Sequence, residues 1–158
     1  MSRRLVLSAL AGAVVLGGGA AATVALVGTA DAAGPTGDPV IAKSSSDPVV
    51  LGSGGTHAFT FTTSVSDDSG IRSVKVLAWP RSSHLAPKAS EMAHVESATC
   101  KASSATTSVC AYRSQVDGKD AADLPTGTWY VAVLVTAKDH GAAFSAKAST
   151  FTVTRHAG

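Results

Sequence analysis

The sequence has few of the residues that mark catalytic, metal-binding and nucleic-acid-binding proteins. Aromatic residues make up 5% and charged residues 15% of its 158 residues, and there are only two cysteines. The five histidines stand singly, without a pair at a metal-binding spacing, and no Gly-x-Ser-x-Gly turn is present. The chain therefore shows no recognisable catalytic or cofactor motif. A Ser-His-Asp site built from distant positions stays open, because such triads assemble only in the folded chain.

The first 32 residues have the composition of an export signal. Arg3 and Arg4 precede an uncharged run over residues 5–29, and an Ala-Asp-Ala sequence at 30–32 is a small-x-small cleavage site. We expect cleavage after Ala32 and a secreted, extracellular product that is not inserted in the membrane. An uncleaved anchor is the alternative, since roughly 20 apolar residues can span a bilayer. The paired arginines leave both general secretory and twin-arginine export open.

The net charge of the remaining chain gives no sign of a nucleic-acid or anionic-lipid partner. Arg3, Arg4 and Asp31 fall in the predicted signal, so the rest carries 11 Lys and Arg against 10 Asp and Glu, a net charge of +1. Nucleic-acid binding requires a basic patch or stripe, and anionic lipid attracts polybasic clusters. We therefore expect no nucleic-acid partner.

Cys100 and Cys110 are the only cysteines and flank a polar stretch rich in serine and threonine. In an oxidising compartment such an isolated pair is typical of a disulfide that closes a hairpin. A metal site would need two further ligands nearby, and a redox pair usually has Cys-x-x-Cys spacing. We predict a disulfide between strands at 91–100 and 109–116.

The pattern beyond residue 46 is that of short strands separated by turns. The strongest run, 128–138, carries Trp129, Val131, Val133, Val135 and Ala137 on one face, and the spacing of two residues per repeat predicts a buried strand face. We expect this face to meet Phe59, Phe61, Val74, Val76, Phe151 and Val153. A change of parity predicts a β-bulge near Ser149 or Thr150.

These runs predict an all-β fold with a simple domain organisation. About seven strands without a helix long enough for a crossover predict an antiparallel sandwich. We assign residues 1–32 to the signal, 33–46 to an N-terminal tether with a short edge strand at 40–42, and 47–158 to the sandwich. The other expected strands cover residues 48–51, 56–65, 71–79 and 144–155.

Two stretches resemble bacterial immunoglobulin-like and fibronectin type III-like modules. Leu124-Pro125-Thr126-Gly127-Thr128-Trp129-Tyr130, continuing through alternating valines to Ala137-Lys138-Asp139-His140-Gly141, is similar to their penultimate strand. Ser66-Asp67-Asp68-Ser69-Gly70-Ile71 resembles the turn into their third strand. The resemblance implies an immunoglobulin-like sandwich of about seven strands, but it specifies no activity. Cys100 and Cys110 lie too close in sequence for the inter-sheet disulfide of antibody domains.

Two features of the sequence are candidates for a site. Asp67 and Asp68 precede the third predicted strand and Asp139 lies between the last two, so in an immunoglobulin-like sandwich all three share one end and offer ligands for Ca²⁺. The alternative is that these residues only form turns. Trp79, beside Pro80, is a candidate for an exposed aromatic contact with a sugar ring, and packing within the fold is the alternative.

The function that we expect is non-catalytic. The sequence indicates a secreted immunoglobulin-like domain with a binding or structural role and an unknown protein or cell-wall partner. The first alternative is a small extracellular inhibitor or ligand carrier, with the loop at 81–89 or at 101–109 as the binding loop. The second is a hydrolase with a site assembled from distant residues.

Overall fold

The computed structural model describes residues 37–52 and 55–156, all of which belong to the unit Ala33–Gly158. The predicted export signal and its cleavage site lie outside the described residues. The described part is all-β in character, with eight strands in two four-stranded sheets, two short 3₁₀ helices and one short α-helix. No helix in this part is long and apolar enough to cross a membrane.

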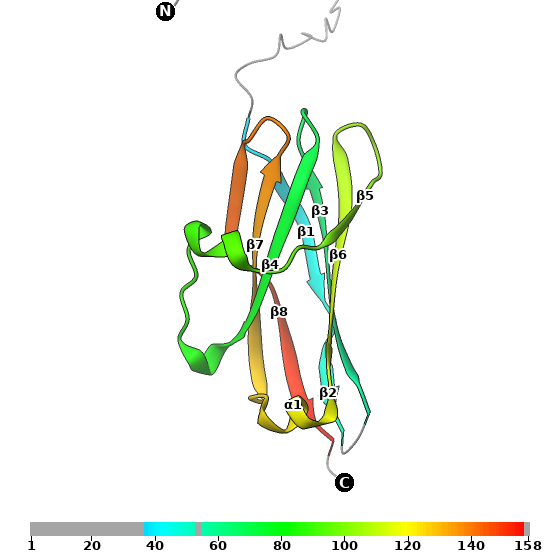
Figure 1. The fold of residues 1–158 in the computed structure, drawn as a ribbon, viewed down its shortest axis with the longest axis vertical. Coiled ribbons are helices and arrows are strands. Elements are labelled where there is room, and N and C mark those ends of the chain that lie inside the picture. Colours follow the sequence, from blue (N-terminus) through cyan, green and yellow to red (C-terminus); the bar gives the residue numbers. More distant parts are fainter. Residues whose placement is uncertain (1–36, 53–54, 157–158) are drawn as a thin grey trace, which may run out of the picture. The chain divides into compact units, whose positions relative to one another are not determined.

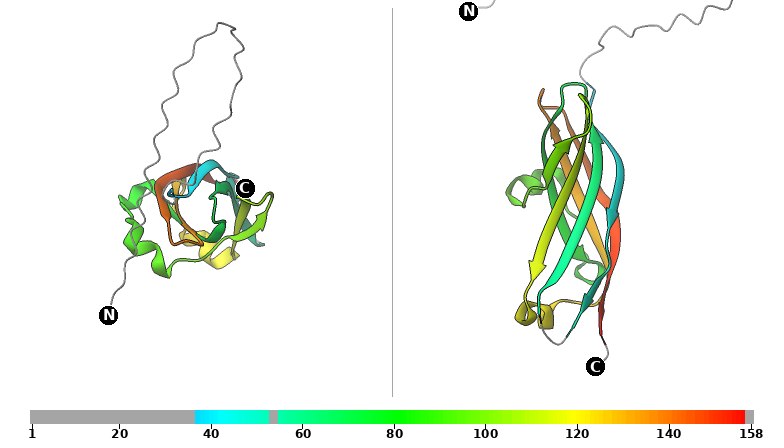
Figure 2. Two further views of the ribbon diagram at one scale, coloured as in Figure 1. Left: turned by 90° about the horizontal axis from the view of Figure 1, so that it is seen from above. Right: turned by 90° about the vertical axis from the view of Figure 1, so that its right-hand side faces the viewer.

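The two sheets form two layers (Figure 1, Figure 2). Sheet A has the order β1-β3-β6-β5, with β1 at Val40–Ser46, β3 at His57–Ser66, β6 at Thr107–Val116 and β5 at Thr99–Ala102. Sheet B has the order β2-β8-β7-β4, with β2 at Val49–Leu51, β8 at Ala142–Arg155, β7 at Gly127–Ala137 and β4 at Ile71–Pro80. The helices are η1 at Arg81–Ser83, η2 at Ala89–His94 and α1 at Gly118–Asp123.

The strand pairing differs from the sequence prediction in two places. The first strand is not a short piece at 40–42, because β1 pairs with β3 from Val40 to Ser46 and takes up half of the predicted tether. The sandwich is also not purely antiparallel, since β2 pairs with β8 in parallel. Both differences have one cause: the chain crosses from sheet A to sheet B between Ser46 and Val49, so its two halves pair with different sheets.

The prediction of a strand over residues 91–100 is also wrong in its first half. Residues 89–94 form η2, and the strand β5 begins only at Thr99. The reason is that Met92 is fully buried against the outer face of sheet B, which an extended segment paired to β6 would leave uncovered. The predicted bulge is present: the register between β7 and β8 shifts where Val131 pairs with Ser149 and Val133 pairs with Ser145.

The main core lies between the two sheets and confirms the predicted face of β7. Val131, Val133, Val135 and Ala137 are fully buried, while Trp129 is half-buried at the edge of the same cluster. The facing side chains come from both sheets and include all the predicted partners: Phe59, Phe61, Val74, Val76, Phe151 and Val153. Burial of such apolar surface is the main term that stabilises a domain of this size.

A second, smaller core lies on the outer face of sheet B. Trp79, Met92 and Ala132 are buried there, with Leu77, Val95, Tyr130, Leu134 and Phe144 packed around them. The covering segment is the connection from Arg81 to Ala98, which leaves β4, forms η1 and η2, and stands beside β4 and β7 in Figure 1. Sheet B is therefore covered on both faces, whereas sheet A is covered on one.

Candidate functional site

Three carboxylates meet at one end of the sandwich. Asp67 and Asp68 lie in the turn between β3 and β4, and Asp139 lies in the turn between β7 and β8. Each offers one oxygen atom such that the three atoms lie within 4.8 Å of one another. The two turns predicted to share one end are thus brought into contact.

The local sequence explains how the two turns hold these side chains. Oδ1 of Asp67 accepts a hydrogen bond from the backbone N–H of Ser69 at 2.9 Å, and Gly70 follows with a φ of +87°, a conformation that glycine adopts without strain. Oδ1 of Asp139 accepts from the backbone N–H of Gly141 at 3.0 Å. The backbone N–H of Asp139 donates to Oγ of Ser69 at 3.2 Å, which joins the two turns.

The carboxylates differ in their exposure. Asp67 is only 7% exposed, Asp139 is half-buried and Asp68 is exposed. Oδ2 of Asp139 is buried and has no hydrogen-bond partner. A depression of about 370 Å³ opens beside the cluster, where Asp67 and Asp68 line it together with Gly37 and Asp38 from the segment before β1.

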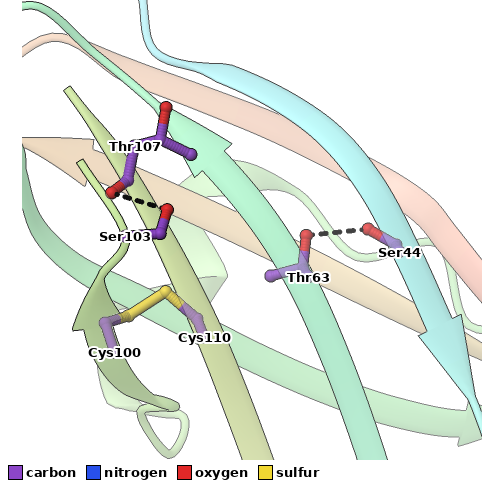
Figure 3. Close-up of a disulfide and its surroundings, with 6 residues drawn as sticks. All are labelled: Ser44, Thr63, Cys100, Ser103, Thr107 and Cys110. Atoms are coloured by element: carbon purple, nitrogen blue, oxygen red, sulfur yellow. Dashed lines mark hydrogen bonds between the residues drawn. A yellow bond between two sulfur atoms is a disulfide. The ribbon is translucent and has the colours of Figure 1, made fainter.

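Cys100 and Cys110 form a disulfide across the edge of sheet A (Figure 3). They are directly opposite each other in the register of β5 and β6, with their Cα atoms 4.0 Å apart. Cys110 is fully buried and belongs to the main core. The turn beyond the bridge is closed by a hydrogen bond that Oγ of Ser103 donates to the carbonyl of Thr107. The predicted pairing is present, although the strand before Cys100 is much shorter than expected.

Trp79 is not an exposed aromatic contact, because only 4% of it is accessible. The centroid of its ring lies 5.8 Å from that of the Tyr130 ring, and Trp79 belongs to the cluster with Met92 and Ala132. The alternation of β4 places Trp79 on the outer face of sheet B, as the sequence indicated, but the connection from Arg81 to Ala98 covers that face. The stacking hypothesis for this residue is therefore wrong.

Two of the described histidines are hydrogen-bonded to partners other than serine. Nε2 of His57 accepts from the backbone N–H of Gly52 at 3.2 Å, and Nδ1 of His140 is hydrogen-bonded to Nη1 of Arg72 at 3.1 Å. Within residues 37–52 and 55–156, no hydrogen bond joins a histidine to a serine hydroxyl.

A shallow groove, which no sequence pattern predicted, opens between the sheets on the side of β4 and β6. It has a volume of about 370 Å³, and Tyr112 and Glu96 meet there through a hydrogen bond from the tyrosine hydroxyl to the carboxylate. Burial, together with this hydrogen bond, raises the pKa of Tyr112 above its usual value. β5 pairs with β6 only as far as Ala111, so within the described part of the chain this edge of β6 has no neighbouring strand from Tyr112 onward.

The comparisons with known proteins assign a family without a function. The model of a family of unknown function, DUF5707, matches residues 42–135, which include strands of both sheets and the connection from Arg81 to Ala98 but not β8. The chain belongs to the DUF5707 family. No curated protein and no solved structure matches it. For this DUF5707 chain, functional arguments therefore depend on its own side chains and surfaces.

Proposed function

We propose that this DUF5707 protein is a secreted immunoglobulin-like sandwich with a non-catalytic binding or structural role at or outside the cell surface. The strand order supports the immunoglobulin-like part. If β1, β3, β4, β5, β6, β7 and β8 are named A to G, sheet A reads A-B-E-D and sheet B reads G-F-C, the arrangement of constant-type immunoglobulin domains. Because this fold carries many activities, the function has to be argued from its surfaces.

The outer face of sheet A is the surface that supports a binding role. Cys110 and the alternating residues of β3 from Phe59 to Val65 point into the core, so their neighbours along each strand point outward. The register aligns these outward residues in rows across the four strands. One row is Lys43, Ser64, Val109 and Lys101, and the next is Ser45, Thr62, Ala111 and Thr99.

This face combines small side chains with positive charge. Val109, in the middle of its row, is 44% exposed, and Lys43, Lys101 and Arg113 are exposed on the same face. The register places no acidic side chain among these rows. Short side chains on a sheet make a flat surface, and the charge selects for a partner that carries carboxylate or phosphate groups. We propose that a flat, anionic component of the cell envelope binds here.

The test is retention of the purified full chain on isolated cell envelopes of the producing organism. We expect sedimentation with the envelopes at low salt and release at high salt, since exposed charges are screened. Lys101→Glu and Arg113→Glu should each weaken retention several-fold. Lys119→Glu on α1 is the matched control, because it makes the same charge change on another element and should have no such effect. Retention that is unchanged by high salt, by Lys101→Glu and by Arg113→Glu would contradict the proposal.

Secretion is the part of the proposal that depends on the N-terminal sequence, and the disulfide supports it. Disulfides persist in oxidising compartments outside the cytosol. We expect protein recovered from culture medium to begin at Ala33 or within a residue or two of it, which N-terminal sequencing measures. Recovery only from membranes, with Met1 or Ser2 intact, would favour the anchored alternative.

One observation favours an inhibitor as the second candidate. The loop after η1 presents Leu85, which is 49% exposed, at a site held by hydrogen bonds on both sides. Oγ of Ser83 donates to the carbonyl of Pro80, and Oε2 of Glu91 accepts from the backbone N–H of Lys88. A rigid loop with one apolar side chain fits the pocket of a partner enzyme. Inhibition of an extracellular protease that Leu85→Ala abolishes would favour this candidate over the envelope-binding face.

A further inference from the structure

The carboxylates of Asp67, Asp68 and Asp139 place three negative charges close together, and the ammonium group of Lys138 lies nearby, over Gly70 of the β3–β4 turn. Their nearest oxygen atoms lie within 4.8 Å of one another, and Asp67 is more than nine-tenths buried. Like charges at this distance repel, and burial strengthens the repulsion because it removes the screening water. Backbone hydrogen bonds satisfy Oδ1 of Asp67 and Oδ1 of Asp139.

The second oxygen of Asp139 is the further observation that points to a cation. Oδ2 is buried and accepts no hydrogen bond, although its neighbour Oδ1 accepts from Gly141. A buried carboxylate oxygen without a partner is costly, and a native fold normally compensates for it with a donor or a cation. Formation of the two turns therefore does not explain why this oxygen is buried beside two further carboxylates.

We propose that Asp67, Asp68 and Asp139 bind a Ca²⁺ ion at this end of the sandwich. The donors are all oxygen atoms, which hard cations prefer, and the cluster contains no cysteine or histidine that would favour a transition metal. The ligands come from two loops, and Ca²⁺ tolerates the irregular geometry that loops provide, whereas Mg²⁺ requires a near-ideal octahedron. Water and backbone carbonyls complete the coordination of such sites.

The segment before β1 gives this ion a structural role. Gly37 and Asp38 line the depression beside Asp67 and Asp68. The carbonyl oxygen of Gly37 and Oδ1 of Asp139 lie 3.5 and 3.3 Å from the point where a Cβ on Gly141 would stand, so the segment before β1 lies against the β7–β8 turn. A cation here would fix the start of β1 against the turns β3–β4 and β7–β8, at the position where the N-terminal segment joins the sandwich.

The experiment titrates CaCl₂ into the full chain after treatment with a chelator. Extracellular calcium modules bind in the range of about 10⁻⁴ to 10⁻³ M, so the titration runs to about 10 mM and heat of binding is recorded by calorimetry. We expect one ion per chain and a rise in Tm of about 5 °C at the highest concentration. MgCl₂ at the same concentrations should have a much smaller effect.

Asp139→Asn distinguishes a residue that binds a cation from a residue that only shapes the turn. The asparagine can still accept the hydrogen bond from Gly141 through its amide oxygen, so a residue that only shapes the turn would be replaced without any change in calcium response. We expect the variant to lose the calcium-dependent rise in Tm and to be at least as stable as the original chain in chelator. Asp68→Asn is the second variant, because this exposed side chain can be changed with little risk to folding, and it should weaken binding about tenfold or more.

Asp123→Asn is the matched control, since it removes an exposed carboxylate on α1, away from both turns, and should leave the calcium response intact. An original chain that shows neither heat nor a shift in Tm at about 10 mM CaCl₂ would overturn the proposal. A calcium response that Asp139→Asn and Asp68→Asn both retain in full would also overturn it.

Discussion

Phe59 of β3 and Phe151 of β8 stack across the interior, with their ring centroids 4.4 Å apart and their planes inclined by 29°. The two residues belong to different sheets, and each contacts a further aromatic ring, Tyr112 beside Phe59 and Trp129 beside Phe151. Four of the chain's few aromatic side chains thus form one group between the layers. This group joins the two sheets without an inter-sheet disulfide.

The first prediction tests which face of β7 is buried. Val133→Ala should lower the free energy of unfolding by about 1–3 kcal/mol, because it removes buried apolar surface and leaves a cavity. Thr136→Ala on the opposite face should change it by no more than about 0.5 kcal/mol. Denaturant unfolding of both variants measures the difference. Equal losses would mean that the strand register is wrong, since a shift of one residue exchanges the two faces.

The faces of the long strands could be predicted from the sequence because their alternation has a direct physical cause. Successive side chains of a strand point to opposite sides. The valines at 131, 133 and 135 therefore share one face of their strand, and Phe59 and Phe61 share one face of theirs. The aspartate-rich turns could be placed at one end by resemblance to immunoglobulin-like modules. The distances between their carboxylates, within 4.8 Å, could not, because they depend on contacts between the turns such as the hydrogen bond from Asp139 to Ser69.

The covering of sheet B could not be predicted because its segment has no periodic pattern. The connection from Arg81 to Ala98 consists of short 3₁₀ turns and irregular chain, and its buried side chains are those of Pro87 and Met92. Only the covered surface gave an indirect indication of the cover. Both faces of β4 and β7 are apolar, because their outer faces carry Leu77, Trp79, Tyr130 and Leu134. A strand that is apolar on both faces requires cover on both.

The second prediction concerns this cover. Met92→Ala should lower the free energy of unfolding by about 2–5 kcal/mol, as is usual when a buried methionine is truncated. The fluorescence of the native variant should also shift to the red, because Trp79 gains contact with water. Leu85→Ala is the control from the same connection, since an exposed side chain should cost no more than about 0.5 kcal/mol. Equal effects of the two changes on stability and fluorescence would show that Met92 does not hold this segment in place.

The third prediction concerns the disulfide. β5 has only four residues and pairs only with β6, so Cys100 and Cys110 provide much of its attachment. Replacing both by alanine should lower the free energy of unfolding by about 2–4 kcal/mol and leave the sandwich folded. Amide hydrogen exchange should increase in β5 more than in β3, which lies inside sheet A. Two free thiols in a mass measurement on the native protein would contradict the bridge.

The last prediction concerns Tyr112 and alkaline pH. Burial and the hydrogen bond to Glu96 raise the pKa of Tyr112 in the folded state above its unfolded value of 10.0. The folded chain therefore keeps the phenolic proton at a pH where the unfolded chain has released it. This contribution to stability is fully present below pH 10, and it is lost as the pH rises through the folded pKa. Tyr112→Phe should abolish this part of the decline, while Tyr130→Phe, which keeps Tyr112, should retain it. Urea unfolding of the three proteins at several pH values above 9 measures the slopes, and a slope that Tyr112→Phe leaves unchanged would assign the decline to other groups.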